Sequence, residues 1–481
     1  MSPTLSPLET ILWRAGQDPI LRMTVGNLII LDARPDLDDL VDRLATVAQA
    51  APRLAWRLDD PTRTRTRPGW AANPTFDARD HVRLLAIPAP GDLRQVLDLV
   101  GLVDATQFET SRSPWDLTVI EGLEGGRAAL YLRADHVLTD GVGGVELMKL
   151  LLDAPEPVVR AAPSTFAATT VPSSDDEGEV APVAPSGAVF AAERKPGTVT
   201  MTLDLTTLAR PVAAGIGVAR HLDPGDAVDT VVRGVQRGVG MVNSVSRQLV
   251  VAGGALSTLT PSGSMGTRFE VLSVPGARAA AVRLGGSRNV LLVAAVAAGL
   301  GDYHQRLGRS VGELRMASPI LVRAPRSGGG NSFAPMRVEV PATVGHPSTH
   351  FGVVADRLAR ARREPAMHLT GPLTTAINLL PSRLLVPAAR AQIGTIDFIA
   401  TTLPGSRTFG AVCGVGIHGS YPFGPRAGRL VNITALGNGD RLDLGIALDP
   451  GAIKEPDVFL ECLEAAFARL IDTTDRSDPG A

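Results

Sequence analysis

Cysteine is nearly absent from this chain of 481 residues, in which only Cys413 and Cys462 occur. Two thiols exclude a disulfide framework and also a zinc site built from several cysteines. Free cysteine usually behaves as a small buried hydrophobic residue, so we expect both thiols to have structural roles.

The chain also lacks an excess of charge of either sign and a long hydrophobic run. It has 47 basic and 49 acidic residues and a formal net charge of −2, so we expect no nucleic-acid partner. The longest apolar stretch, residues 290–300, is too short to cross a bilayer. No basic segment followed by an apolar run opens the chain, so we expect no signal peptide and predict a cytoplasmic protein.

The composition is that of a globular protein, 44% hydrophobic, with alternating strand and helix patterns. These patterns predict an α/β fold of two halves with mixed sheets. We assign residues 1–153 to a first domain, 154–198 to a linker rich in Pro, Ala and Ser, and 199–481 to a second domain. The predicted strands are 23–31, 117–123, 128–135, 268–274, 314–322, 333–340, 397–403, 430–436 and 442–448, of which the second and third form a hairpin. The predicted helices are 37–47, 93–100, 144–152, 226–251, 289–307 and 459–470.

The segment from residue 130 to residue 144 carries the clearest chemical signal. A strand period of two places Ala134 and His136 on one face, and Arg133 and Asp135 on the other. His136 ends this strand, where a neutral imidazole can accept a proton from a hydroxyl group. The same pattern also fits a packed structural histidine, and spacing alone does not decide between the two roles. A metal site at His136 and Asp140 is disfavoured, because no other histidine or carboxylate lies at ligand spacing.

The motif His136-x-x-x-Asp140-Gly141 resembles one shared by CoA-dependent acyltransferases, in particular the bacterial wax ester synthase/diacylglycerol acyltransferases. Other segments are similar to that family and occur in the same order along nearly the whole chain. They include Leu5-Ser-Pro-Leu-Glu9, Arg112-Ser-Pro-Trp-Asp-Leu117, Pro404-Gly405, Tyr421-Pro422, Asn432-Ile-Thr434 and Leu448-Asp-Pro450. Each match is weak alone, but their common order favours a catalytic role for His136.

The resemblance implies two chloramphenicol-acetyltransferase-like domains with an active-site tunnel where they meet. It further implies that the protein transfers a long-chain acyl group from acyl-CoA to diacylglycerol or a fatty alcohol. In this reaction His136 is the general base that accepts the proton of the alcohol. Asp140 then holds the motif loop, and Gly141 allows a close backbone approach. Acyl-CoA is the co-substrate, and we expect no further cofactor and no metal. A membrane or lipid-droplet surface is a candidate binding partner.

The sequence departs from the family pattern at three places. Asp135 stands where the family has a first histidine, Asn289-Val290 stands for Asn-Asp, and Thr401-Thr402 stands for Ser-Asn. Asn289, Thr401 and Thr402 therefore become candidates for oxyanion stabilisation or substrate positioning. The departures leave two alternatives open: an acyltransferase with a specialised acceptor, and a protein that binds acyl-CoA or lipid but has lost catalysis. A hydrolase is a third reading, although the sequence contains no Gly-x-Ser-x-Gly elbow.

Overall fold

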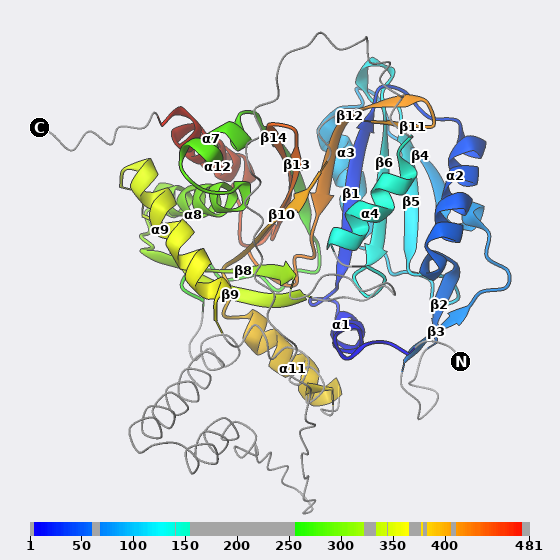
Figure 1. Ribbon diagram of the computed structural model, residues 1–481, viewed down its shortest axis with the longest axis horizontal. Helices are drawn as coiled ribbons and strands as arrows, with labels where there is room; N and C mark the ends of the chain where they lie inside the picture. The colour runs from blue at the N-terminus through cyan, green and yellow to red at the C-terminus, as the bar shows by residue number, and fades with distance from the viewer. Residues whose placement is uncertain are drawn as a thin grey trace, which may run out of the picture. The chain divides into compact units, whose positions relative to one another are not determined.

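The computed structural model describes residues 4–59, 68–139, 141–153, 255–321, 333–343, 345–364, 377–378, 382–405 and 410–473. These residues form two six-stranded sheets and one two-stranded sheet, with helices packed against them (Figure 1). The predicted linker 154–198, the predicted helix 226–251 and Asp140 lie outside the described residues.

The first six-stranded sheet has the strand order β11-β12-β1-β6-β5-β4. Its strands are β1 (Thr24–Leu31), β4 (Val82–Ala86), β5 (Trp115–Glu121), β6 (Ala128–Asp135), β11 (Ala411–Val412) and β12 (Val415–Phe423). Strands β4 and β5 pair in parallel, whereas the other neighbours are antiparallel, so the sheet is mixed. The predicted hairpin is confirmed by the pairing of β5 with β6, and a short 3-10 turn, η3 (Glu124–Gly126), connects them.

Four α-helices accompany this sheet: α1 (Pro7–Gly16), α2 (Leu37–Ala50), α3 (Leu93–Asp104) and α4 (Gly141–Leu151). The smaller elements are β2 (Trp56–Asp59), β3 (Gly69–Ala72), η1 (Pro52–Ala55) and η2 (Ala78–His81). Helix α2 begins after Asp36, whose carboxylate accepts two backbone N–H groups of the first turn, as expected for an N-cap.

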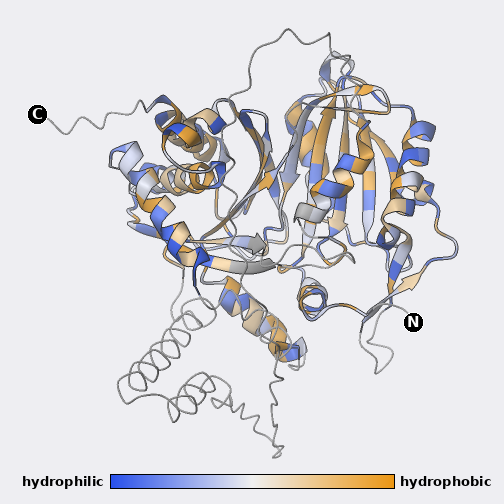
Figure 2. Cartoon of the chain, in the orientation of Figure 1, coloured by the Kyte–Doolittle hydropathy of each residue, from blue (hydrophilic) through white to orange (hydrophobic). Residues whose placement is uncertain are grey.

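Strand β6 divides its side chains between two hydrophobic clusters, as the period of two predicts. Leu130 is buried in the cluster that contains α2 and the end of α4. Tyr131 is buried in the cluster that contains α3. The hydropathy colouring in Figure 2 shows the corresponding apolar strands beneath these helices.

The second six-stranded sheet has the order β7-β14-β13-β10-β8-β9. Its strands are β7 (Arg268–Val274), β8 (Glu313–Leu321), β9 (Phe333–Pro341), β10 (Phe398–Pro404), β13 (Val431–Asn438) and β14 (Arg441–Leu448). Strand β10 runs parallel to β13 and β8, and the remaining pairs are antiparallel. The predicted mixed character therefore holds in this sheet too.

The helices of this half are α7 (Ala277–Arg283), α8 (Arg288–Arg306), α9 (Pro347–Arg362), α11 (Ser382–Ile393) and α12 (Pro456–Asp472). Helix α8 is buried over most of its length and forms one core with α12, α9 and one face of the sheet. In the part of the chain that is described, no single helix is long and apolar enough to cross a membrane; α7 and α8 satisfy that criterion only together, and they are bent by 97°.

Strand β12 is the main difference from the sequence prediction. It belongs to the second half of the chain, yet it pairs antiparallel with β1 and so completes the first sheet. Its sequence contains Gly416, Gly419 and Pro422, which are poor strand formers, and this explains why its pattern was missed. A domain division by continuous residue ranges therefore does not describe which strands share a sheet.

Helix α4 also differs from its prediction, because it begins at Gly141 rather than Gly144. Glycine has a low helix propensity, which made the first turn look like a loop. The helix therefore starts directly at the motif glycine.

Candidate active site

His136 lies directly after strand β6, at the start of the turn that leads toward α4. Its backbone N–H donates to the carbonyl oxygen of Met23 at 2.8 Å, which extends the β1–β6 ladder by one residue. Val137 and Leu138, which follow it, are buried in the cluster that contains α2. The half-buried imidazole is thus displayed from a backbone that is held on both sides.

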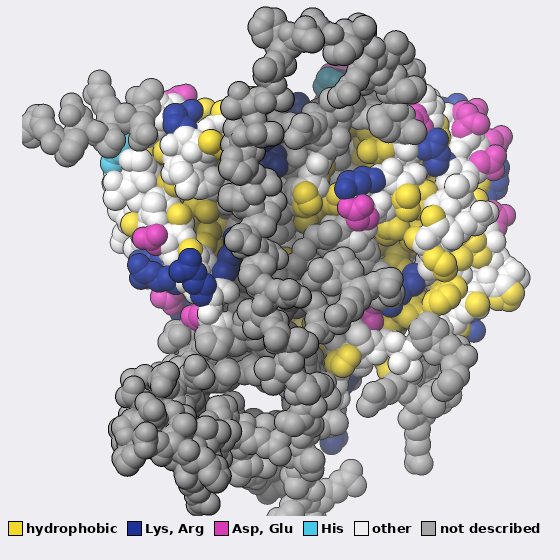
Figure 3. Space-filling model, viewed as in Figure 1, with side chains coloured by type: hydrophobic (Ala, Val, Ile, Leu, Met, Phe, Trp, Pro, Cys, Tyr) yellow, Lys and Arg dark blue, Asp and Glu magenta, His cyan; other side chains and the backbone are white. Residues whose placement is uncertain are grey.

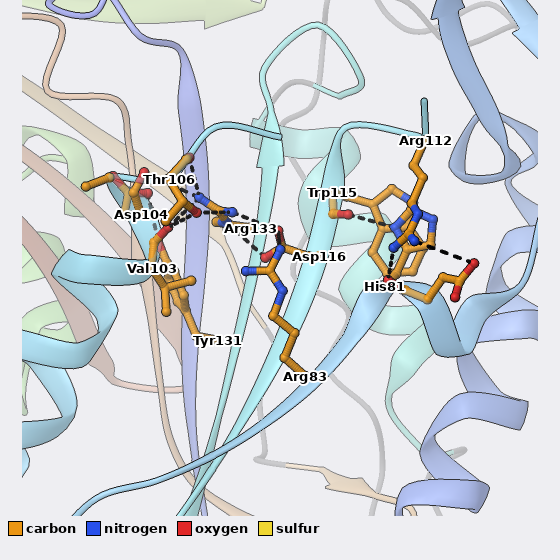
Figure 4. A network of polar contacts seen from close by, with 12 residues as sticks. His81, Arg83, Val103, Asp104, Thr106, Arg112, Trp115, Asp116, Tyr131 and Arg133 are labelled. Atoms are coloured by element: carbon orange, nitrogen blue, oxygen red, sulfur yellow. Dashed lines mark hydrogen bonds and ion pairs between the residues drawn. The ribbon is translucent and has the colours of Figure 1, made fainter. Parts of the chain in front are cut away.

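Residues 1–153 contain one other histidine, His81, which serves as a comparison. His81 is 3% exposed, its Nδ1 lies 2.8 Å from the Trp115 carbonyl oxygen, and its ring stacks on Trp115 (Figure 4). Burial lowers the pKa of this imidazole, so His81 is a neutral packing residue. His136 is the more exposed of the two.

Asp135, which replaces a histidine of the resembling family, shapes the turn that carries His136. Its carboxylate Oδ1 accepts the backbone N–H of Val137 at 2.9 Å, and its carbonyl oxygen accepts the N–H of Leu138 at 2.9 Å. Burial raises the pKa of this carboxyl to about 6, and the hydrogen bond from Val137 opposes that rise. The carboxylate therefore closes the turn. Its burial removes it from water, and this loss of solvation raises the free energy of the charged form.

This raised pKa predicts how the variant Asp135→Asn changes stability with pH. The folded state holds a proton on Asp135 between about pH 4 and 6 that the unfolded state releases, so ionisation destabilises the fold as pH rises through this window. Asparagine keeps an acceptor for Val137 but carries no charge. We expect it to raise the free energy of unfolding by about 2 kcal/mol at pH 7.5 and to have little effect at pH 4. Urea unfolding at both pH values measures this, and equal changes at the two values would contradict it.

Gly141 allows the first turn of α4 to approach the second sheet. A Cβ atom at this position would lie 2.9 Å from Cδ2 of Leu403, on strand β10. Leu403 is therefore the neighbour that a side chain at position 141 would meet first. The contact brings the motif helix beside the strand that carries Thr401 and Thr402.

Thr401 and Thr402 point to opposite faces of β10. Phe398 and Ala400 are buried in the core with α8, and the strand alternation places Thr402 on that same face. The Thr402 hydroxyl is buried and has no hydrogen-bond partner among the described residues. Thr401 shares the opposite face with Leu403, which is the face that meets Gly141.

Asn289 lies in the first turn of α8 and is half-buried. Helix α8 packs on the face of the second sheet that carries Ala400. The structure thus groups Asn289 with Thr402 on one side of the sheet, and Thr401 with the start of α4 on the other side. Of the three predicted positioning residues, Thr401 is the one on the side of the motif helix.

Two further polar residues lie on this side and were not selected from the sequence. In the parallel register, Thr401 is paired with Thr434, and Ile399 is paired with Asn432. Thr434 and Asn432 are both buried, and their side chains are hydrogen-bonded to each other at 3.3 Å. The Asn-Ile-Thr segment was noted only as a sequence match; the register is what places it beside Thr401.

The strand that carries His136 is anchored by a buried arginine, Arg133. Its guanidinium donates two hydrogen bonds of 2.8 Å to the carboxylate of Asp116 on β5 (Figure 4). It also donates to the carbonyl oxygens of Val103 at 2.5 Å and Thr106 at 2.9 Å, at the C-terminal end of α3. A cation at this end of a helix is favourable because the unsatisfied carbonyl groups carry negative partial charge.

A cavity of about 40 Å³ lies on the face of the first sheet that carries α3 and Arg133. Its lining includes Thr24 on β1, Asp104 at the end of α3, Thr267, and Phe423 at the end of β12. Thr24 is the strand partner of Asp135, so the cavity lies on the Asp135 face of the sheet, opposite the face that the strand alternation assigns to Ala134 and His136. Burial raises the pKa of the Asp104 carboxyl, which accepts the Tyr131 hydroxyl at 2.9 Å. Among the described residues, no group of three or more His, Cys, Asp or Glu side chains is arranged to hold a metal ion.

Comparison with known protein families identifies the family of this chain. The sequence model of the wax ester synthase/diacylglycerol acyltransferase catalytic domain matches residues 5–284, and that of the C-terminal domain of the same family matches residues 329–471. The chain belongs to the wax ester synthase/diacylglycerol acyltransferase family. The family predicted from the motif order, and with it an acyl-CoA-dependent O-acyltransferase, is confirmed.

Several relatives of this acyltransferase cover nearly its whole length. A Mycobacterium tuberculosis protein to which diacylglycerol O-acyltransferase activity is ascribed is 27% identical over 98% of this chain and 92% of its own length. A second protein of that organism, ascribed the same activity, is 24% identical over 95% of this chain and 93% of its own length.

Solved structures confirm the two-domain, chloramphenicol-acetyltransferase-like fold. The wax ester synthase/diacylglycerol acyltransferase of Marinobacter aquaeolei VT8 aligns with 97% of this acyltransferase and 98% of its own chain, with a TM-score of 0.58 and 20% identity. The starter condensation domain of rhizomide synthetase, solved in complex with C8-CoA, aligns with 99% and 98% of the two chains, with a TM-score of 0.56 and 12% identity. At such low identity these likenesses concern the fold.

Proposed function

We propose that this acyltransferase moves a long-chain acyl group from acyl-CoA to a lipophilic alcohol, diacylglycerol or a fatty alcohol, with His136 as the general base. The observation that carries the proposal is the placement of His136 between two supported elements. It follows a strand that Arg133 anchors, and it precedes a helix whose first residue meets β10 of the second sheet. A reactive side chain on a rigid strand end, beside a second sheet, suits a reaction between two bound substrates.

In the proposed reaction, a ring nitrogen of His136 accepts the proton of the acceptor hydroxyl. The alcohol oxygen forms a bond to the thioester carbonyl carbon, and the carbonyl oxygen becomes an oxyanion. The oxyanion collapses, the carbon–sulfur bond breaks, and the CoA thiolate takes the proton from His136. No acyl-enzyme forms, and the residue ends each cycle in its starting protonation state.

The oxyanion needs a hydrogen-bond donor that is in place before the reaction. Thr401 is the favoured donor, because it shares the face of β10 that meets the motif helix. Asn289 and Thr402 lie on the α8 side of that sheet and are better suited to supporting the strand. Asp140 keeps its proposed role of holding the motif loop.

We also propose where the substrates approach. We propose that a tunnel reaches His136 from the face of β6 that carries Ala134; the cavity lined by Thr24 lies on the opposite face, beside α3. Leu102 is 69% exposed on α3 next to the cavity-lining Gly101, and Met265, itself part of the lining, is 65% exposed. Exposed apolar side chains such as these favour contact with a membrane or lipid-droplet surface, where a lipophilic acceptor dissolves. Figure 3 shows further hydrophobic side chains on the face that carries α4, where Leu150 is 45% exposed.

We place the enzyme in the cytoplasm, at a membrane or lipid-droplet surface. Its co-substrate is acyl-CoA, and it needs no additional cofactor.

A second candidate function is binding of acyl-CoA or lipid without catalysis. The observation that favours it is Asp135, because a carboxyl group with a pKa of about 6 adjoins the proposed base where the family has a histidine. An acyltransferase with a specialised acceptor explains the same substitution by a changed pocket.

The deciding experiment follows radiolabelled palmitoyl-CoA into product esters. The purified protein is incubated with dioleoylglycerol, hexadecanol or a short alcohol, and the lipids are separated by thin-layer chromatography. We expect labelled ester with at least one of the two lipophilic alcohols. Tight binding of palmitoyl-CoA without any ester would support the binding protein, and ester formation only with the short alcohol would support the specialised acceptor.

A further inference from the structure

The C-terminal end of α4 is held by residues from two distant parts of the chain. Arg43, on α2, donates hydrogen bonds from Nη1 to the carbonyl oxygens of Leu151 at 3.3 Å and Leu152 at 2.9 Å. These carbonyls belong to the last turn of the helix and the residue after it, where a cation offsets the negative end of the helix dipole. The second terminal nitrogen of the guanidinium, Nη2, donates to Oδ1 of Asp153 at 2.8 Å.

Asp153 connects the same point to the β11–β12 hairpin, which lies some 260 residues later in the chain. Its Oδ1 accepts the backbone N–H of Cys413 at 3.2 Å, and its Oδ2 accepts that of Gly414 at 2.8 Å. Its own N–H donates to the carbonyl oxygen of Ala411 at 2.8 Å. Cys413 and Gly414 have φ values of 50° and 76°, as a two-residue hairpin turn requires.

The apolar side chains around this point form one packed group. Leu151 and Val412 are buried in the same cluster, and Leu152 and Cys413 pack against it. Helix α4 is therefore fixed at both ends. Gly141 meets Leu403 of the second sheet at the start of the helix, and the pair Arg43–Asp153 joins its end to α2 and to the hairpin that completes the first sheet.

We propose that Arg43 and Asp153 are positioning residues that set the placement of α4, and through it the placement of His136 against the second sheet. The inference rests on the proposed function of His136. The side chains of Arg43 and Asp153 are 31% and 26% exposed, and an ion pair this accessible to water contributes little to folding stability. The ion pair instead fixes the position of α4. This position matters because a displacement of about 1 Å in a reacting group can lower the rate a hundredfold.

The test compares Asp153→Ala, Arg43→Ala and the double variant in the palmitoyl-CoA assay. We expect each single variant to lower kcat about tenfold while KM for palmitoyl-CoA and the melting temperature stay nearly unchanged. The double variant is expected to lose no more than either single one, because both residues act in one contact. Lys149→Ala, which removes an exposed pair with Glu146 on the same helix, is the matched control and is expected to keep full activity.

Three results would overturn the inference: an unchanged kcat in the single variants, a loss that follows the melting temperature, or a double variant whose loss is the product of the two. If Asp153→Ala does not fold, Arg43→Gln decides, since it keeps a polar side chain but removes the charge and the paired contacts. The unaltered protein and His136→Ala are measured beside these variants. Absence of transfer in the unaltered protein would refute the proposed function, whereas normal transfer in both single variants would refute only the positioning role.

Discussion

Replacement of His136 by alanine is expected to lower kcat for ester formation by at least about a hundredfold, the usual worth of a general base. The loss is expected in kcat rather than in binding, because the imidazole acts on the acceptor proton in the transition state. The melting temperature is expected to stay close to that of the unaltered protein, since His136 is half-buried and the turn is held by Val137 and Leu138.

The measurement is steady-state ester formation together with the dissociation constant for palmitoyl-CoA. His346, exposed at the start of α9 with Nδ1 2.8 Å from the Ser348 hydroxyl, supplies the matched control His346→Ala, which is expected to be fully active. Turnover within threefold of the unaltered protein in His136→Ala would refute the general-base role. Equal losses in both histidine variants would point instead to an unspecific effect of the substitution.

Replacement of Arg133 by methionine is expected to lower the free energy of unfolding by about 3–5 kcal/mol. Arg133 is fully buried and supplies two hydrogen bonds to Asp116 and others to the end of α3. Methionine fills similar space but leaves a buried carboxylate and two carbonyl oxygens without these donors. Arg83, whose Nη2 lies 3.1 Å from Asp116 and whose side chain is 45% exposed, offsets only part of the loss.

Urea unfolding followed by circular dichroism measures this change. The double variant Arg133→Met/Asp116→Leu is expected to recover much of the stability, because the unpaired charge is then absent. Arg79→Met, which removes an exposed pair with Asp38, is the surface control and is expected to have no measurable effect. A loss below about 1 kcal/mol in Arg133→Met would show that the buried network is not what holds β6.

Much of this fold could be predicted from local patterns. Strand β6 and helix α2 were predicted because hydrophobic periodicity is a property of short segments. Strand β12 could not, because its glycines and proline conceal the alternation and its place beside β1 depends on a pairing of residues nearly 400 positions apart. The pairing of β12 with β1 depends on residues far apart in the chain, so no short segment of sequence can predict it.

The same distinction applies to the candidate site. The alternation along β6 predicted that Asp135 and His136 lie on opposite faces, since this depends on neighbouring residues only. The sequence also grouped Asn289, Thr401 and Thr402 as equivalent candidates. The packing of α8 on one face of β10 separates Thr401 from the other two, and only the arrangement of the second sheet reveals this difference.

The pairing of Asp153 with the Cys413–Gly414 turn has the same origin. The contact of Asp153 with Cys413 and Gly414 exists only because the β11–β12 hairpin returns to the first sheet, which the local sequence around these three residues does not indicate. When a helix follows a catalytic motif, contacts at the far end of the helix affect where the motif lies. The end of such a helix is therefore a reasonable place to search for long-range contacts.

The central claim, direct transfer of the acyl group by a base at His136, is tested by rapid-quench measurement of free CoA released from palmitoyl-CoA with and without hexadecanol or dioleoylglycerol. The account predicts that CoA release requires an alcohol, matches the ester formed mole for mole and is lost in His136→Ala. A burst of CoA equal to the enzyme concentration without any alcohol would indicate an acyl-enzyme and contradict direct transfer. Alcohol-dependent release that persists in His136→Ala would place the base elsewhere.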